Sequence, residues 1–213
     1  MRDPKSRQTI GLLSALLLAV LAVAVRLGLT AGPDLAGITA AQSIASPALD
    51  VVANWHTVIG QVIPTVLASL VLAVIAWRRY GPLSALAPLL ILVTGAIELV
   101  LKLVTAHPPP GEEYVRAFMN PLGVRVHTPS AFPSGHVTRL VFLALLIGAM
   151  FPARWWPPVA AGLVAASLFL RVYIGDHWPS DVLGGLALGT AVGALAVTWY
   201  QSAASKSSLT RRK

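Results

Sequence analysis

The chain has 213 residues, of which 56% are hydrophobic and only 11% are charged. A soluble domain carries roughly 25% charged residues, so this composition excludes a disordered chain and an ordinary soluble fold. The net charge of +8 is dispersed along the sequence, unlike the clustered basic surface of a nucleic-acid-binding protein. The absence of cysteine excludes disulfides and thiol chemistry. We therefore expect a membrane protein surrounded by lipid, with no nucleic-acid partner.

Apolar runs of about 20 residues can cross the hydrocarbon layer as helices. Six such runs, without the alternation typical of a membrane barrel, predict an all-α fold. This fold is a polytopic bundle of six transmembrane helices in a single domain over residues 1–213. The predicted spans are, in chain order, Ile10–Leu29, Val58–Trp77, Leu83–Ala106, Val137–Phe151, Pro158–Ile174 and Val182–Tyr200. Basic residues precede the first run, so a signal peptide is the alternative there; the long apolar stretch favours an uncleaved span.

The distribution of lysine and arginine predicts that both termini are cytoplasmic. In that orientation the cytoplasmic side receives ten of the sixteen basic residues, including the basic tail at about 201–213, and among the acids only Asp3. The other side receives most of the acidic residues. We expect a multi-pass protein of the plasma (inner) membrane.

Several polar residues fall inside or beside these spans, where each charge costs about 2.5–3.5 kcal/mol. They are Lys102 at the end of the third span, His136 and Arg139 at the start of the fourth, Arg171 at the end of the fifth, His177 in the loop that follows, and Asp181 at the start of the sixth. On the predicted topology all of them lie at one level, on the non-cytoplasmic side. Glu98 stands four residues before Lys102, so we expect these two to pair on one helix face.

This set of residues suits phosphoryl transfer. Fixed cations neutralise charge on phosphate oxygens, one imidazole can attack phosphorus, and another can protonate the leaving oxygen. A carboxylate four residues after a histidine can orient its ring. The segment Ser134-Gly135 stands at a helix start, where backbone N–H groups favour an anion and glycine permits close approach; Ser134 could instead be only a helix cap.

A metal site is the alternative for the same residues. His136, His177 and Asp181 could form a two-histidine, one-carboxylate set. Lys102 and Arg171 beside them would repel a divalent cation and attract an oxyanion. We therefore expect no metal.

Two of these segments resemble motifs of the type 2 phosphatidic acid phosphatase superfamily, which also contains the vanadium haloperoxidases. The family's Arg, five residues, His, three residues, Asp motif is matched by Arg171, His177 and Asp181, and its Pro-Ser-Gly-His motif by residues 133–136. The first motif, Lys followed after six residues by Arg-Pro, is incomplete. Lys102 is present, but Pro109 replaces the arginine, and His107 stands where a further arginine often occurs. The motif-bearing core covers about residues 102–185.

The resemblance implies a role for each matched residue. His177 would be the nucleophile that forms a phosphohistidine, Asp181 its orienting partner and His136 the acid for the leaving group. The phosphate oxygens would be held by Lys102, Arg171, Ser134 and the Gly135 backbone, without metal or other cofactor. Arg139 is the first substitute we expect for the missing arginine; Arg116, Arg125, His107 and His127 lie in the same outer loop.

The sequence thus predicts a metal-independent membrane phosphatase that removes the terminal phosphate of a lipid phosphate or diphosphate. Phosphatidate, phosphatidylglycerophosphate, a sphingoid phosphate and a polyprenyl diphosphate such as undecaprenyl diphosphate all fit, and the outer loop at 108–132 is expected to shape headgroup selection. One alternative, favoured by the missing arginine, is an impaired relative that binds phosphate or acts as a membrane scaffold. A transporter or flippase is another. The sequence contains no signal for an oligomeric state.

Overall fold

The computed structural model describes residues 3–116 and 130–210, and all regular structure within these residues is helical. The predicted all-α fold is therefore confirmed. The elements are α1 (Pro4–Arg26), α2 (Ala31–Gln42), α3 (Pro47–His56), η1 (Thr57–Gly60), α4 (Val62–Tyr80), α5 (Pro82–Leu89), α6 (Ile91–Thr105), η2 (Glu112–Tyr114), α7 (Gly135–Met150), α8 (Trp156–Tyr173) and α9 (Pro179–Thr210).

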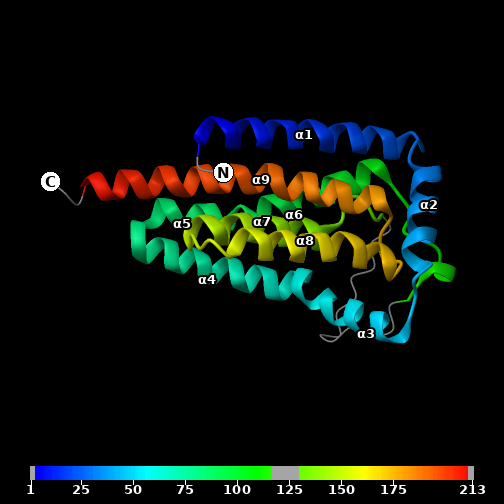
Figure 1. Ribbon diagram of the computed structural model, residues 1–213. Coiled ribbons are helices and arrows are strands. Elements are labelled where there is room, and N and C mark those ends of the chain that lie inside the picture. The colour runs from blue at the N-terminus through cyan, green and yellow to red at the C-terminus, as the bar shows by residue number, and fades with distance from the viewer. Residues whose placement is uncertain (1–2, 117–129, 211–213) are drawn as a thin grey trace.

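The helices α1, α4, α7, α8, α9 and the consecutive pair α5–α6 run side by side as a bundle (Figure 1). All of these except α7 are long and apolar enough to cross a membrane, with α5 and α6 together forming one span from Pro82 to Thr105. Large apolar side chains on α1, such as Leu12 and Leu16, remain exposed, as expected of a surface that faces lipid. The protein is an integral membrane protein.

The helix α7 corresponds to the fourth predicted span but has only 16 residues. At 1.5 Å per residue it is about 24 Å long, shorter than a hydrocarbon core of about 30 Å. Every residue from Val137 to Ala144 is buried. Neighbouring helices, rather than lipid, cover this helix, so its length need not match the membrane thickness.

Glycines on α9 allow it to approach α7 closely. A Cβ at Gly185 would stand 2.5 Å from the backbone oxygen of Ser134, and a Cβ at Gly189 would stand 2.6 Å from that of Thr138. At the same contact, Phe142 of α7 and Leu188 of α9 belong to the main hydrophobic core. The contact fixes the start of α7 against the start of α9, where two of the predicted motifs lie.

No element is predicted between the first two spans, but α2 and α3 occupy this stretch. The pair α2 and α3–η1 is bent by 118° and would count as a sixth span by composition alone. Figure 1 shows instead that α2 lies across one end of the bundle. It is held there by Asp34, whose buried carboxylate accepts hydrogen bonds of 2.8 Å from both the backbone nitrogen and Oγ of Ser180 on α9.

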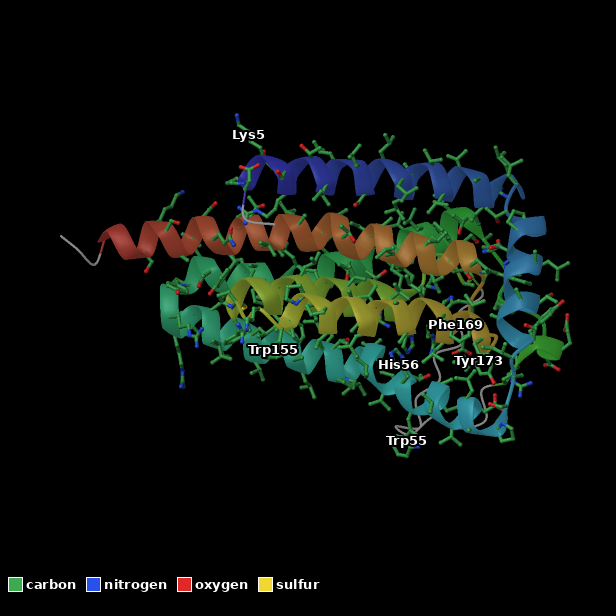
Figure 2. The ribbon with its side chains drawn as sticks, viewed as in Figure 1. Lys5, Trp55, His56, Trp155, Phe169 and Tyr173 are labelled. Atoms are coloured by element: carbon green, nitrogen blue, oxygen red, sulfur yellow. The ribbon has the colours of Figure 1, made fainter. Side chains whose placement is uncertain are left out.

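The two ends of the bundle differ. The start of α1 and the end of α9 lie at the end opposite α2 (Figure 1). Figure 2 shows Lys5 and Trp155 toward that end, and His56, Phe169 and Tyr173 toward the end that α2 covers. Both described ends of the chain therefore lie on one side of the bundle, away from α2.

Candidate active site

The motif residues lie at the ends of four helices. Lys102 is in the last turn of α6, Gly135 opens α7, Arg171 is in the last turn of α8 and Asp181 is in the first turn of α9. Successive passes run in opposite directions, so these four ends meet at the end of the bundle that α2 covers (Figure 1). The antiparallel topology thus gathers residues that are up to 79 positions apart (181 − 102).

A backbone hydrogen bond connects the second and third motifs directly. The Ser134 nitrogen donates to the Asp181 carbonyl oxygen at 2.9 Å. One turn deeper, the Thr138 hydroxyl donates to the Gly185 carbonyl at 3.2 Å. His136 and Asp181 are therefore fixed relative to each other by main-chain contacts.

Asp181 is fully buried and faces His177. Its Oδ2 lies 3.4 Å from His177 Nδ1 and accepts a hydrogen bond of 2.8 Å from the Trp178 backbone nitrogen. The Trp178 contact fixes the carboxylate, and the carboxylate in turn faces the ring nitrogen of His177. This is the arrangement that an orienting partner requires.

The other oxygen of Asp181 contacts His107, a residue of the outer loop for which the sequence predicts no contact with Asp181. His107 Nδ1 lies 2.9 Å from Asp181 Oδ1. The His107 backbone is held by Ser130 Oγ at 3.0 Å and by Ala131 nitrogen at 2.7 Å. The Asp181 carboxylate therefore contacts two imidazoles, one with each oxygen. The only sequence signal for His107 is its position in the incomplete first motif.

Lys102 and Arg139 lie on either side of Glu98. Lys102 Nζ donates to the Ser130 carbonyl at 2.8 Å and stands 3.9 Å from Glu98 Oε1. Arg139 Nε donates to the Gly60 carbonyl at 3.1 Å, and its Nη1 lies 3.2 Å from Glu98 Oε2. The expected pairing of Glu98 with Lys102 is confirmed, and the structure adds Arg139 to it.

Arg171 reaches the site from α8. Its Nη1 donates to Thr57 Oγ1 at 3.1 Å and its Nη2 forms an ion pair with Asp176. The backbone nitrogen of His177 lies 3.3 Å from the Arg171 carbonyl. The loop between α8 and α9 thus folds back on Arg171, which sets the position of His177.

Ser134 Oγ and His136 Nε2 are buried and have no hydrogen-bond partner among the described residues, 3–116 and 130–210. Buried polar groups are rarely left without a partner, so this cluster is suited to a polar ligand. Ser134 also makes no side-chain cap on α7, so the capping role considered for it is not observed. His136 lies within electrostatic range of Arg171, Arg139 and His177.

The described part of the outer loop is tied to α3 and α8. Arg116 makes two hydrogen bonds of 2.8 Å to the Asp50 carboxylate, which raises the pKa of the Arg116 guanidinium. Tyr173 Oη donates to the same carboxylate at 2.6 Å. Arg116 is therefore paired with Asp50. The other two outer-loop residues predicted near the site, Arg125 and His127, lie outside the described residues.

The described part of the chain, residues 3–116 and 130–210, contains no group of three or more His, Asp or Glu side chains placed to hold a metal ion. The site is instead rich in fixed positive charge from Lys102, Arg139 and Arg171.

A family model described as the PAP2 superfamily matches residues 83–205, more than half of the chain. The match includes all motif residues from Lys102 to Asp181. Among curated proteins, the chain is 41% identical over 76 residues to a decaprenylphosphoryl-5-phosphoribose phosphatase of Mycobacterium tuberculosis, covering 35% of this chain and 41% of that protein. It is 30% identical over 101 residues to a lipid A 4'-phosphatase of Porphyromonas gingivalis, covering 47% and 41%.

A third relative is the undecaprenyl-diphosphatase BcrC of Bacillus subtilis, 40% identical over 68 residues, or 31% of this chain and 33% of the relative. The matched region thus spans less than half the length of each of these relatives. Among solved structures, a transmembrane PAP2-type phosphatidylglycerolphosphate phosphatase from Bacillus subtilis aligns with a TM-score of 0.69 at 23% identity, over 92% of this chain and 94% of the other. LpxE from Aquifex aeolicus aligns with a TM-score of 0.61 at 19% identity, over 76% and 93%. The chain shares their fold.

Proposed function

Because the chain belongs to the PAP2 superfamily, we propose that it is a membrane phosphatase that hydrolyses the terminal phosphate of a lipid phosphate or lipid diphosphate. The observation that carries this proposal is the meeting of Lys102, Ser134–His136, Arg171 and His177–Asp181 at one end of a membrane bundle. There, a headgroup can reach the cations while its hydrocarbon chain stays in the membrane. The curated relatives, named as phosphatases of lipid-linked substrates, support this substrate class.

The first chemical step is assigned to His177 and His136. The His177 nitrogen remote from Asp181 attacks phosphorus, the bond to the leaving oxygen breaks, and His136 gives a proton to that oxygen. The products of this step are a phosphohistidine and the free lipid alcohol, or a lipid monophosphate from a diphosphate. The 3.4 Å contact between His177 Nδ1 and Asp181 Oδ2 supports the orientation this attack needs.

The second step regenerates the enzyme. Water attacks phosphorus, its proton passes to His136, the nitrogen–phosphorus bond of His177 breaks, and inorganic phosphate leaves. The phosphate oxygens are stabilised in both steps by the N–H groups at the start of α7 and by the positive charges of Lys102, Arg171 and Arg139. These fixed cations occupy the role that a metal ion serves in other phosphatases, and we therefore propose a metal-independent reaction.

We also propose that the site faces the non-cytoplasmic side of the plasma membrane. The helix ends remote from α2 carry most of the basic loop residues, including Arg78, Arg79 and Arg154, and such residues favour the cytoplasmic side. The described ends of α1 and α9 lie at that same end (Figure 1).

The test is phosphate release by the full chain purified in detergent. Phosphatidate, phosphatidylglycerophosphate, a sphingoid phosphate and undecaprenyl diphosphate are presented at equal surface concentration, each with and without a chelator. We expect release from at least one lipid, undiminished by chelator and inhibited by vanadate. His177→Ala should reduce release to background, and His136→Ala should lower it by about 10²–10⁴-fold. Loss of activity in chelator would contradict the metal-independent mechanism.

A phosphatase-impaired relative that binds phosphate is the second candidate. It is favoured by Pro109 at the position of the family arginine and by the engagement of Arg139 with Glu98. In that case the wild-type chain and His177→Ala would release equally little phosphate from every lipid, while inorganic phosphate would still raise the melting temperature of both.

A further inference from the structure

The carboxylate of Glu98 lies directly over the first residue of α7. A Cβ placed on Gly135 would clash with both carboxylate oxygens of Glu98. Gly135 therefore allows an anion to approach the backbone at the start of this helix, and the anion found there is a side chain of the protein. The Glu98 side chain is only 17% exposed.

The charges around Glu98 are those that the proposed function assigns to phosphate binding. Lys102 Nζ stands 3.9 Å from one carboxylate oxygen and Arg139 Nη1 stands 3.2 Å from the other. The N-terminus of α7 adds a partial positive charge on the third side. An internal carboxylate thus lies where a phosphate would meet Lys102, Arg139 and Gly135.

Each of the two cations also has a backbone acceptor. Lys102 also donates to the Ser130 carbonyl, and Arg139 to the Gly60 carbonyl. If the only purpose of Glu98 were to satisfy a buried cation, contact with Gly135 would be unnecessary. Glu98 therefore contacts the start of α7 in addition to the two bases.

We infer that Glu98 is a positioning residue that fills the phosphate-binding position with its own carboxylate and is displaced when the substrate phosphate enters. This inference rests on the proposed function. A phosphate brings more negative charge and more oxygens than a carboxylate, so it can replace Glu98 against the same cations. Once displaced, Glu98 leaves Arg139 free to contact the substrate. Glu98 thereby sets the affinity of the site and favours multiply charged phosphates over single carboxylates.

The decisive variant is Glu98→Gln, which keeps the shape and the hydrogen-bonding oxygen but removes the charge. We expect the inhibition constant of vanadate and the KM for the lipid substrate to fall together by about tenfold, since a competing charge at ion-pair distance is removed. The value of kcat should change less. Asp3→Asn removes the same charge from the exposed residue immediately before α1, at the opposite end of the bundle (Figure 1), and we expect it to leave both constants at their wild-type values.

The opposite result would overturn the inference. If Glu98→Gln leaves the vanadate constant unchanged or weakens inhibition, Glu98 is a structural partner of Lys102 and Arg139 and nothing more. Glu98→Ala, which also removes the charge, is used if the glutamine variant does not fold, with the same expected direction.

A binding measurement separates this inference from the proposed activity. In a His177→Ala background, inorganic phosphate should raise the melting temperature more strongly when Glu98→Gln is added. If no lipid yields phosphate but this difference persists, the proposed activity fails and the role of Glu98 stands. If lipid phosphate is hydrolysed but Glu98→Gln changes neither binding nor inhibition, the role of Glu98 fails alone.

Discussion

Asp181 joins two histidines that come from different parts of the chain. Its Oδ2 faces His177 Nδ1 at 3.4 Å, and its Oδ1 faces His107 Nδ1 at 2.9 Å. A buried carboxylate needs several partners to remain charged, and Asp181 has only the two imidazoles and the Trp178 nitrogen as partners among the contacts of the described residues. We therefore expect His107 to influence the proposed reaction through its contact with Asp181.

We predict that His107→Ala lowers kcat by about tenfold, the effect of one hydrogen bond to a charged group, with little change in KM. His107→Asn keeps an N–H donor near the position of Nδ1 and should retain most of the activity. The measurement is phosphate release over a range of lipid concentrations and pH values. Equal kcat and equal pH profiles for His107→Ala and the wild type would show that the contact does not support catalysis.

The contact between α7 and α9 depends on the absence of side chains at particular positions of α9. Gly185 lies against the backbone of Ser134, the residue immediately before the start of α7. Adding even one methyl group there must push the two helices apart, and a packed interior resists such movement.

We predict that Gly185→Ala destabilises the protein by about 1–3 kcal/mol and also lowers activity, because it separates the second motif from the third. Thermal unfolding in detergent measures the first effect. Gly162→Ala is the matched control, since no atom lies within 4 Å of a Cβ at this exposed position on α8. It should leave stability unchanged or raise it slightly. Equal melting temperatures for the two variants would contradict the close-packing explanation.

Two aspartates bind serines in the same way in different surroundings. Asp34 on α2 accepts hydrogen bonds from the nitrogen and Oγ of Ser180, and Asp3 accepts the same two bonds from Ser6 at the start of α1. The Asp34 pair is buried and the Asp3 pair is exposed. The two pairs differ in burial and in what they join, since Asp3 caps its own helix and Asp34 joins α2 to α9.

We predict that Asp34→Ala costs roughly 1–3 kcal/mol, because two buried donors at the start of α9 lose their acceptor. Asp3→Ala should lower the melting temperature much less, since water replaces its carboxylate. The melting temperatures of both variants give the comparison. A larger effect at Asp3 would mean that α2 is not held in place by this contact.

The orientation of the whole molecule is open to a labelling test, because the chain contains no cysteine. Single cysteines are introduced at the exposed positions Glu112, near the site, and Ser202, near the end of α9. In intact cells of a bacterial host, a membrane-impermeant maleimide should label Glu112→Cys and spare Ser202→Cys. Permeabilised cells should show both labelled. The reverse pattern in intact cells would place the site on the cytoplasmic side.

The membrane class, the all-α architecture and the positions of most spans follow from the amino-acid sequence alone. The length of an apolar run can be read directly from the sequence. A run long enough to cross the bilayer forms a helix, because lipid offers no hydrogen-bond partners to its backbone groups. The motif spacings likewise predicted which residues to examine, and alternation of span direction predicted that Lys102, His136, Arg171 and Asp181 share one end. The fourth predicted span corresponds to α7, which has only 16 residues. Because α7 is largely buried among other helices, it does not need the full length of a membrane span.

Which side chains contact one another depends instead on how the helices pack. The contacts of Glu98 with Gly135, His107 with Asp181, and Asp34 with Ser180 join residues 37, 74 and 146 positions apart. No local periodicity encodes such pairs, because they depend on how the helices pack and on which side chains the packing leaves facing each other. The same reason explains why α2 was not predicted, since its place depends on the contact of Asp34 with Ser180 and on the burial of Ile38 against other helices.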